Sequence, residues 1–291
     1  MDLVVPERLV AACAGQPERT AWLARLPGTL VALAGRWSLA FGPPFDGDDV
    51  SASWVAPATR ADGTGAVLKL GIPHMEAEHE LAGLRLWAGD PTVRLLEADE
   101  DLGAMLLERC LPGTPLRSRP EPEQDVVLAG LLRRLWRVQV PPGAPFRPLA
   151  EMTAYWAAES LAGAARWPDP GLVREGLALL AELPGSAPAA THVLLATDLH
   201  AGNVLRAERR PWLAIDPKPF VGDPAYDATQ HLFNCTERVV ADPAGTIARF
   251  ADLLGVERQR VRAWMFARAT AEARQDWDDE WFGLAPALAP L

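Results

Sequence analysis

The sequence contains few cysteines and no long apolar run. Its cysteines, Cys13, Cys110 and Cys235, are odd in number, far apart and in no metal-ligand spacing, which argues against a disulfide framework or a zinc site. No apolar stretch approaches the roughly 20 residues that a membrane span requires. The first ten residues also lack the basic and apolar regions of a secretory signal. We therefore expect reduced thiols, no membrane partner and a cytoplasmic location.

The sequence is also short of positive charge. Lys and Arg number 28 against 38 Asp and Glu, so the formal net charge is −10. Nucleic-acid binding depends on a basic face that neutralises phosphates, so nucleic acid is not an expected partner. Acidic clefts attract cationic small molecules, and a cationic or polyhydroxylated small molecule is the expected substrate. Many proteins are acidic only for solubility, however, and nothing in the sequence sets an oligomeric state.

The length and the order of patterns predict two lobes. The chain has 291 residues, 49% of them apolar, which suits one large or two modest domains. Residues 1–36 have a helical pattern, with Pro6 and Pro17 placed where a first helical turn accepts proline. Pro27 and the glycine after it are expected to end the second helix. We interpret this segment as a helical cap on the first lobe.

From residue 37 onward the pattern changes to β-type runs separated by Gly and Asp turns, which predicts an antiparallel meander. Two more apolar runs within 93–110 bring the sheet to five strands. The first lobe is therefore expected to span 1–110, with the cap over 1–36 and the sheet and one helix over 37–110. The first turn, Asp46-Gly47-Asp48-Asp49, is a poor phosphate-binding loop because it has one glycine and three acids.

A lysine at the end of the third strand is a candidate for nucleotide binding. Lys69 follows Ala-Val-Leu, close to the motif whose lysine pairs with nucleotide phosphates in kinases, although a lone strand lysine is more often a surface charge. Residues 74–88 predict an amphipathic helix. Glu80 in its middle is the expected partner of Lys69, and Glu76 is the alternative.

The second lobe, 111–291, is predicted to be mostly helical, so the fold class is α+β. The Pro-Gly-Thr-Pro stretch at 112–115 resembles a linker. Apolar residues then recur at helical spacing. The expected helices cover 121–139, 151–167, 171–183, 223–238, 243–254 and 257–274.

The most specific pattern lies in residues 193–218. Asp198 and Asn203 have the spacing D-L-x-x-x-N, and Asp216 ends a later strand, as in the catalytic loop and metal-binding motif of kinases. Phosphoryl transfer needs an acid that orients the attacking hydroxyl and oxygen ligands that hold Mg²⁺. The alternative is a polar turn between strands. The D-L-x-x-x-N motif and the later aspartate together favour Asp198 as the base, with Asn203 and Asp216 as metal ligands.

The motifs A-V-L-K, L-L-E-R-C-x-P-G-T-P-L, D-L-H-A-G-N-V-L and I-D-P-K-P-x-x-G-D-P-x-x-D together resemble the aminoglycoside phosphotransferase superfamily. Within it, the chain is similar to the branch of streptomycin 6-kinase and hydroxyurea phosphotransferase, over nearly its whole length. The resemblance implies a bilobal protein-kinase-like fold and an antibiotic-resistance kinase that uses ATP and Mg²⁺ on a hydroxyl of a small molecule such as streptomycin. The alternatives are a kinase of hydroxyurea or of an endogenous sugar or amino alcohol, and a nucleotide-binding pseudokinase.

The resemblance also implies roles for individual residues. Lys69 would hold phosphates and Glu80 would brace it. The backbone of the segment from Glu108 to Cys110 would meet the adenine edge. Asp198 would be the base, and Asn203 and Asp216 would bind magnesium.

The loop before Asp198 departs from the pattern of the superfamily. Many members carry His-Gly there, whereas this chain has Ala196 and Thr197, so the support that the histidine gives to the loop is missing. The candidates to replace it are His200 and the Thr197 hydroxyl.

The segment after Asp216 favours a small-molecule kinase over a protein kinase. A helix is predicted only a few residues later, which leaves little room for a peptide-binding activation loop. Asp223 is expected to cap this helix with Pro224 at its first position, with a direct substrate role as the alternative. Asp227 either braces the catalytic loop or is a solvated acid of the first turn.

An acidic and aromatic cluster near the C-terminus is a candidate for the acceptor site. Carboxylates and aromatic rings together bind cations through ion pairs and cation–π contacts. A final helix that buries its rings and solvates its acids is equally consistent with the pattern. The candidate residues are Asp276, Trp277, Asp278, Asp279 and Trp281.

Overall fold

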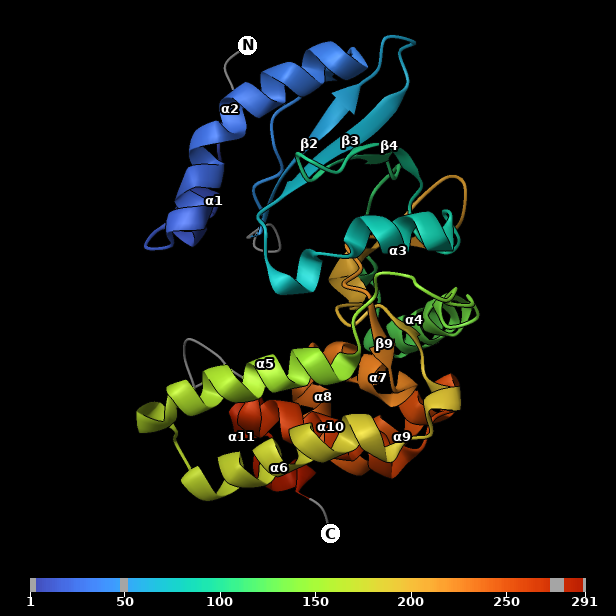
Figure 1. Cartoon of the computed structure of the whole chain (residues 1–291). Coiled ribbons are helices and arrows are strands. Elements are labelled where there is room, and N and C mark those ends of the chain that lie inside the picture. Colours follow the sequence, from blue (N-terminus) through green and yellow to red (C-terminus); the bar gives the residue numbers. More distant parts are fainter. Residues whose placement is uncertain (1–3, 48–51, 273–279, 290–291) are drawn as a thin grey trace. The chain divides into compact units, whose positions relative to one another are not determined.

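The computed structural model describes residues 4–47, 52–272 and 280–289. The chain forms two compact units (Figure 1). Unit 1 contains Met1–Thr114 and Leu205–Leu213, and unit 2 contains Pro115–Val204 and Ala214–Leu291. The first unit thus includes a short segment from the second half of the chain, whereas the sequence pattern placed all residues beyond 110 in the second lobe. No helix among the described residues is long and apolar enough to cross a membrane.

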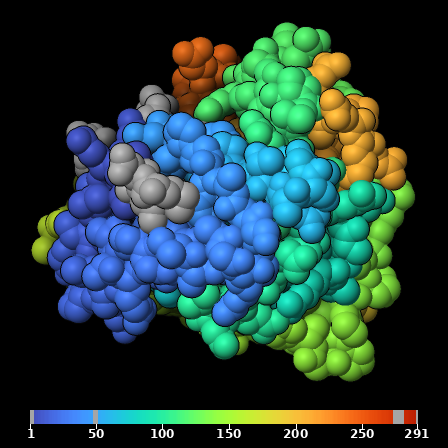
Figure 2. All heavy atoms as spheres, turned by 90° about the horizontal axis from the view of Figure 1, so that it is seen from above, coloured from blue at the N-terminus to red at the C-terminus, as the bar shows by residue number. Residues whose placement is uncertain are grey.

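Unit 1 begins with two helices, α1 (Glu7–Cys13) and α2 (Pro17–Trp37). Their residues form a continuous dark to mid blue surface in Figure 2. The prediction that Pro27 ends the second helix is wrong, since α2 continues for ten residues beyond it. Leu26, Leu30 and Leu33 of this helix are almost completely buried against the sheet. Burial stabilises by about 1.5–3 kcal/mol per leucine, so the three leucines together outweigh the roughly 3 kcal/mol cost of one internal proline.

The sheet of unit 1 has the five strands that the sequence predicts, in the order β1-β2-β3-β5-β4. All its neighbouring strands are antiparallel. The last two strands do not continue the meander, because β5 rather than β4 lies beside β3. The strands are β1 (Ala40–Phe41), β2 (Ser53–Thr59), β3 (Gly65–Gly71), β4 (Leu95–Asp99) and β5 (Ala104–Glu108). The predicted helix over 74–88 is a short 3₁₀ turn followed by α3 (Glu80–Trp87).

Unit 2 is mostly helical, as predicted, and two small sheets carry the central stretch of the sequence. In one sheet β6 (Val193–Leu195) pairs with β9 (Phe220–Gly222). In the other sheet β7 (Val204–Arg206) pairs with β8 (Trp212–Ala214). Most residues of this second sheet belong to unit 1. The helix predicted over 223–238 is two helices. The helices are α4 (Glu121–Leu135), α5 (Leu149–Ala162), α6 (Pro170–Ser186), α7 (Pro224–Phe233), α8 (Thr236–Ala241), α9 (Pro243–Leu254), α10 (Arg258–Ala271), α11 (Glu280–Gly283) and α12 (Ala285–Leu288).

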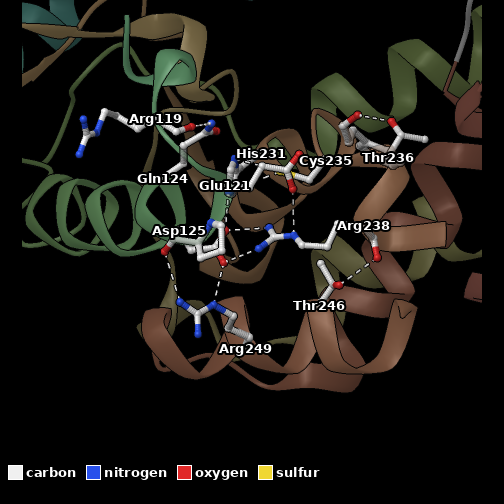
Figure 3. Close-up of polar contacts among 12 residues, drawn as sticks. Arg119, Glu121, Gln124, Asp125, His231, Cys235, Thr236, Arg238, Thr246 and Arg249 are labelled. Atoms are coloured by element: carbon white, nitrogen blue, oxygen red, sulfur yellow. Dashed lines mark hydrogen bonds and ion pairs between the residues drawn. The ribbon is translucent and has the colours of Figure 1, made fainter. Parts of the chain in front are cut away.

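A buried ionic cluster around Asp125 joins four helices of unit 2 (Figure 3). The Asp125 carboxylate on α4 is fully buried and accepts two hydrogen bonds from Arg238 on α8, at 2.7 and 2.8 Å. It also contacts His231 Nε2 on α7 at 2.8 Å and Arg249 Nε on α9 at 2.9 Å. Glu121 lies 3.1 Å from Arg238 Nε. One carboxylate therefore fastens α4 to the three helices that follow residues 193–218 in the chain.

The contact between α6 and α10 depends on a glycine, which gives a testable prediction. A Cβ atom at Gly176 would overlap Thr270 Oγ1 and lie 2.9 Å from the Ala271 Cβ atom. We expect Gly176→Ala to lower the free energy of unfolding by about 1–3 kcal/mol, the usual cost of overpacking. Gly130→Ala is the matched control, because its Cβ would meet nothing within 4 Å on the exposed side of α4.

Alanine is the better helix former, so this control should gain about 0.5–1 kcal/mol. Urea denaturation of both variants measures the difference. Equal stability of the two variants would show that α10 shifts freely to accept the extra methyl group.

Candidate active site

The loop over residues 196–203 carries the candidate base, and we call it the catalytic loop after the motif that predicts its role. It begins where β6 ends and returns the chain to β7. Asp198 lies in this loop with its side chain 33% exposed, and Asn203 closes a 3₁₀ turn over Ala201–Asn203. Asp216 follows β8 and is 30% exposed. Thr197 and Asp216 adopt left-handed φ angles of 50° and 51°, which side-chain-bearing residues rarely adopt and which persist only where surrounding contacts enforce them.

Asp227 on α7 supplies the main support of this loop. Its Oδ1 accepts the Thr197 amide at 2.8 Å, and its Oδ2 accepts the Ala196 amide at 3.1 Å and Trp136 Nε1 at 2.8 Å. Burial raises the pKa of Asp227 to about 6, against the hydrogen bonds that lower it. Of the two interpretations of Asp227, the brace is confirmed and the solvated acid is wrong.

The Thr197 hydroxyl adds a second support. It donates to the Lys218 carbonyl at 2.6 Å, and the Lys218 amide donates to the Ala196 carbonyl at 2.8 Å. His200 acts more locally, since its Nδ1 accepts the Gly202 amide at 3.1 Å. Asp227 and Thr197 together therefore hold the backbone of the loop immediately before Asp198.

Asp223 caps α7 as predicted. Its Oδ1 accepts the Ala225 amide at 3.0 Å, and its Oδ2 accepts Arg260 Nε at 2.5 Å and Trp264 Nε1 at 2.6 Å. The side chain is 5% exposed. These contacts use both oxygens and favour a structural role over a direct substrate role.

The oxygens at Asn203 and Asp216 fit a magnesium ion. Asn203 Nδ2 donates to the Asp198 carbonyl at 3.0 Å, so the amide oxygen is the atom that faces away from this bond. Among the described residues no group of three or more His, Cys, Asp or Glu is arranged to hold a metal ion. Mg²⁺ is commonly held by one or two protein oxygens together with nucleotide phosphates, which is the kind of site that one amide and one carboxylate can provide.

Lys218 lies beside both carboxylates, although the sequence motifs assign it no role. Its Nζ donates to Asp216 Oδ1 at 2.5 Å and lies 4.0 Å from Asp198 Oδ2. A signal for it is nevertheless present in the composition. Of the 28 basic residues only Lys69 and Lys218 are lysines, and the other 26 are arginines. A lysine count would have drawn attention to both positions.

Unit 1 brings Lys69 and Glu80 together. Lys69 Nζ on β3 contacts both Glu80 carboxylate oxygens at 2.6 Å, and both side chains are less than 10% exposed. Glu80, the first of the two candidates, thus holds the lysine. A buried charge pair of this kind fixes an ammonium in place, because either partner alone would be costly to bury.

The segment expected at the adenine edge lies at the end of β5. The Glu108 amide donates to the Arg94 carbonyl at 2.8 Å, and the Glu108 carboxylate forms a two-pronged pair with Arg209 at 2.7 and 2.8 Å. Burial acts to raise the pKa of Glu108, but the Arg209 hydrogen bonds lower it below its usual value. Arg209 is in the segment that returns to unit 1, so this pair anchors that segment. Burial raises the pKa of Cys110 to about 11, which keeps its thiol protonated.

The C-terminal cluster is only partly described. Asp276, Trp277, Asp278 and Asp279 lie outside the described residues. Trp281 stacks on Phe233 with ring centroids 4.2 Å apart, and its ring lies 5.6 Å from the guanidinium of Arg268. The cation over Trp281 in this structure is therefore one of the protein's own side chains.

The Arg268 guanidinium is enclosed by aromatic rings. It lies 5.0–5.5 Å from the ring centroids of Trp156, Tyr226 and Phe233 as well. Glu272 accepts from its Nε at 2.6 Å. Each cation–π contact is worth about 0.5–2 kcal/mol, so this cage contributes to the packing of α10 in unit 2.

The brace at Asp227 gives a prediction that combines stability and pH. Asp227→Asn leaves one oxygen to serve three N–H donors, so at least one buried donor loses its partner, at a cost of about 1–3 kcal/mol each. The folded wild type takes up a proton near pH 6, whereas an unfolded aspartate does so near pH 4. Asparagine does not titrate, so the stability difference between wild type and variant should widen as pH falls from about 6 to about 4.

Chemical denaturation at several pH values measures this difference. Asp169→Asn, at an exposed cap of α6, is the control for loss of one carboxylate oxygen at a helix start and should cost less stability at pH 7 than Asp227→Asn. A pH-independent difference for Asp227→Asn would contradict the raised pKa.

Unit 1 has an antiparallel sheet with a buried Lys–Glu pair. Unit 2 is helical and carries an aspartate and an asparagine on a braced loop, with a second aspartate after β8. These features define a protein-kinase-like phosphotransferase. A solved structure of choline kinase LicA from Streptococcus pneumoniae has the same fold, with a TM-score of 0.63 and 12% identity over 91% of this chain and 97% of that one. LicA has also been solved in complex with AMP. This likeness establishes the fold, and sequence relatives establish the family.

The model of the aminoglycoside/hydroxyurea antibiotic resistance kinase family matches residues 37–280. Streptomycin 6-kinase from Streptomyces glaucescens is 38% identical over 99% of this chain and 95% of that protein. Hydroxyurea phosphotransferase from Kitasatospora aureofaciens is 40% identical over 87% of this chain and 74% of that protein. The chain belongs to this family, and it is a small-molecule kinase.

Proposed function

We propose that the protein transfers the γ-phosphoryl group of ATP to a hydroxyl of streptomycin or a similar aminoglycoside, with the help of Mg²⁺. The observation that carries the choice of acceptor is the similarity to streptomycin 6-kinase, which extends over nearly all of both chains. The similarity to hydroxyurea phosphotransferase leaves about a quarter of that protein unmatched. The use of a nucleotide is supported by the kinase-like fold.

In the proposed reaction Asp198 orients the acceptor hydroxyl and takes up its proton. The acceptor oxygen forms a bond to the γ-phosphorus while the bond from that phosphorus to the β,γ-bridging oxygen breaks. Asp198 suits this role because its carboxylate is partly exposed, while its backbone is held by Asn203 and by the braces of the loop. A positioned base of this kind contributes about 10²–10⁴-fold to the rate.

Charge on the phosphates requires cationic partners. Asn203 and Asp216 would hold Mg²⁺, which when bound neutralises charge on the nucleotide phosphates. Lys69 would contact phosphate oxygens and Glu80 would keep it in place. The acids Asp276, Asp278 and Asp279 are proposed to attract the cationic groups of the acceptor, with Trp277 and Trp281 as neighbouring aromatic residues.

An acceptor panel tests the proposal. Purified protein is incubated with ATP or GTP, with and without Mg²⁺, and with streptomycin, hydroxyurea or an amino alcohol in turn. We expect a mass increase of one phosphoryl group on streptomycin, only with ATP and Mg²⁺. Asp198→Ala serves as the inactive control. Phosphorylation of none of the acceptors, together with nucleotide binding, would instead support a pseudokinase.

Hydroxyurea is the second candidate acceptor. Its support is the 40% identity to hydroxyurea phosphotransferase over 87% of this chain. The same panel decides between the two acceptors by their relative kcat/KM values. A higher value for hydroxyurea would contradict the assignment of streptomycin.

A further inference from the structure

Lys218 is in an unusual position for a charged residue. It is 8% exposed, bonded to Asp216 and 4.0 Å from Asp198. Its ammonium group thus lies close to both the proposed base and the proposed metal ligand. Lys218 has no function among the residue roles that the resemblance implies, and none in the proposed reaction.

The backbone around Lys218 is held rigidly. Pro217 and Pro219 flank it, which fixes the φ angles on both sides and restricts its own conformation. Its amide and carbonyl are hydrogen-bonded to Ala196 and Thr197 of the catalytic loop. The Cα position is therefore fixed, while the four-carbon side chain lets the ammonium move over a short range.

The choice of lysine is informative because this chain otherwise uses arginine. Both of its lysines are more than 90% buried and contact carboxylates, at Glu80 and at Asp216. Arginine forms planar, two-pronged pairs that are hard to displace, whereas an ammonium is a compact point charge. A residue that must give up its carboxylate to another cation is better served by lysine.

We propose that Lys218 is the resident cation of the Asp198–Asp216 pair, and that Mg²⁺ displaces it from Asp216. In the metal-free protein the ammonium offsets the repulsion between the two carboxylates. Because it competes for Asp216 Oδ1, it raises the Mg²⁺ concentration at which that oxygen becomes a metal ligand. This inference rests on the proposed kinase site, and it makes Lys218 a positioning residue.

The test measures metal binding without turnover. Wild type, Lys218→Met and Lys218→Arg are titrated with Mg²⁺ in the presence of a non-hydrolysable ATP analogue and without acceptor. Isothermal calorimetry and the shift in Tm follow binding. Removal of a competing charge next to the ion should tighten Mg²⁺ binding about tenfold or more in Lys218→Met. Lys218→Arg keeps the charge in a form that is harder to displace from a carboxylate and should bind Mg²⁺ more weakly than wild type.

Two further variants separate tighter Mg²⁺ binding from a general effect of charge removal and from misfolding. Arg174→Met removes one positive charge from the exposed face of α6 and should leave Mg²⁺ affinity unchanged. Lys218→Gln keeps a hydrogen-bond donor without charge and takes the place of Lys218→Met if that variant does not fold. Its Mg²⁺ affinity should also rise. A purely structural role would lower Tm without changing the affinity for the ion.

The possible failures are distinguishable. If Mg²⁺ binds to wild type and is lost in Asp216→Asn, but Lys218→Met binds it equally or more weakly, only the inference about Lys218 is overturned. If wild type and Asp216→Asn respond to Mg²⁺ alike, the metal assignment of the proposed function is wrong, and the inference is overturned with it.

Discussion

Asp198→Ala is expected to lower kcat by about 10²–10⁴-fold, the usual contribution of a positioned acid or base. The Kd of the nucleotide should hardly change. Asn203 bonds to the carbonyl of Asp198 and not to its carboxylate, so the substitution leaves the support of Asn203 intact. The loss should therefore appear in the chemical step and not in the folding of the loop.

Steady-state kinetics with the acceptor identified by the panel, together with nucleotide titration, measure the two effects separately. Asp252→Ala removes an exposed acid that pairs with Arg258 and is the matched control, with kcat expected at the wild-type level. Near-normal turnover of Asp198→Ala would remove Asp198 from the mechanism. An equal loss of nucleotide binding would indicate that the loop had rearranged.

The second large effect concerns stability. Asp125→Ala is expected to lower the free energy of unfolding by about 3–5 kcal/mol, because removal of one partner from a buried ionic cluster leaves the others uncompensated. Arg238 and His231 would both lose a hydrogen-bond partner in the interior of unit 2. One of the four helices, α7, carries Asp227, which holds the loop before Asp198, so turnover at elevated temperature should fall as well.

The effect should depend on pH in a defined direction. Burial acts to raise the pKa of Asp125, but the hydrogen bonds from His231 and Arg238 outweigh it and hold the pKa well below the usual value. An unfolded aspartate titrates near pH 4. The stabilisation is therefore fully present above about pH 4, and it is lost as pH falls from there through the lower folded pKa.

Urea denaturation of wild type and Asp125→Ala at pH 7 and at successive values below 4 measures this dependence. The stability difference should be largest at neutral pH and should shrink in acid. Asp252→Ala, at an exposed pair on α9, should give a much smaller difference at pH 7. If Asp125→Ala unfolds at the same urea concentration as wild type at pH 7, the cluster does not stabilise unit 2.

The structure also shows why some predictions from sequence failed. The expectation that a proline ends α2 considers only the neighbouring residues in the chain. The helix continues because three of its leucines pack on a sheet that is formed by residues later in the sequence. Asp227 had two equal interpretations because its donors lie 30 and 31 residues away, on the catalytic loop. Sequence spacing carries no information on contacts of that range.

The sequence by itself determined the features that depend on short spacing. The strands and helices are predicted by the regular spacing of apolar residues. The set of Asp198, Asn203 and Asp216 is recognisable because all three residues lie within one loop and the hairpin that follows it. Only the tertiary structure decided that Glu80 holds Lys69, that Arg209 ties residues 205–213 to unit 1, and that Lys218 lies beside two carboxylates. Each of these contacts is an ion pair, and it forms only if the packed helices and strands direct the two side chains toward each other. That packing minimises the free energy of the whole chain and not of any one segment.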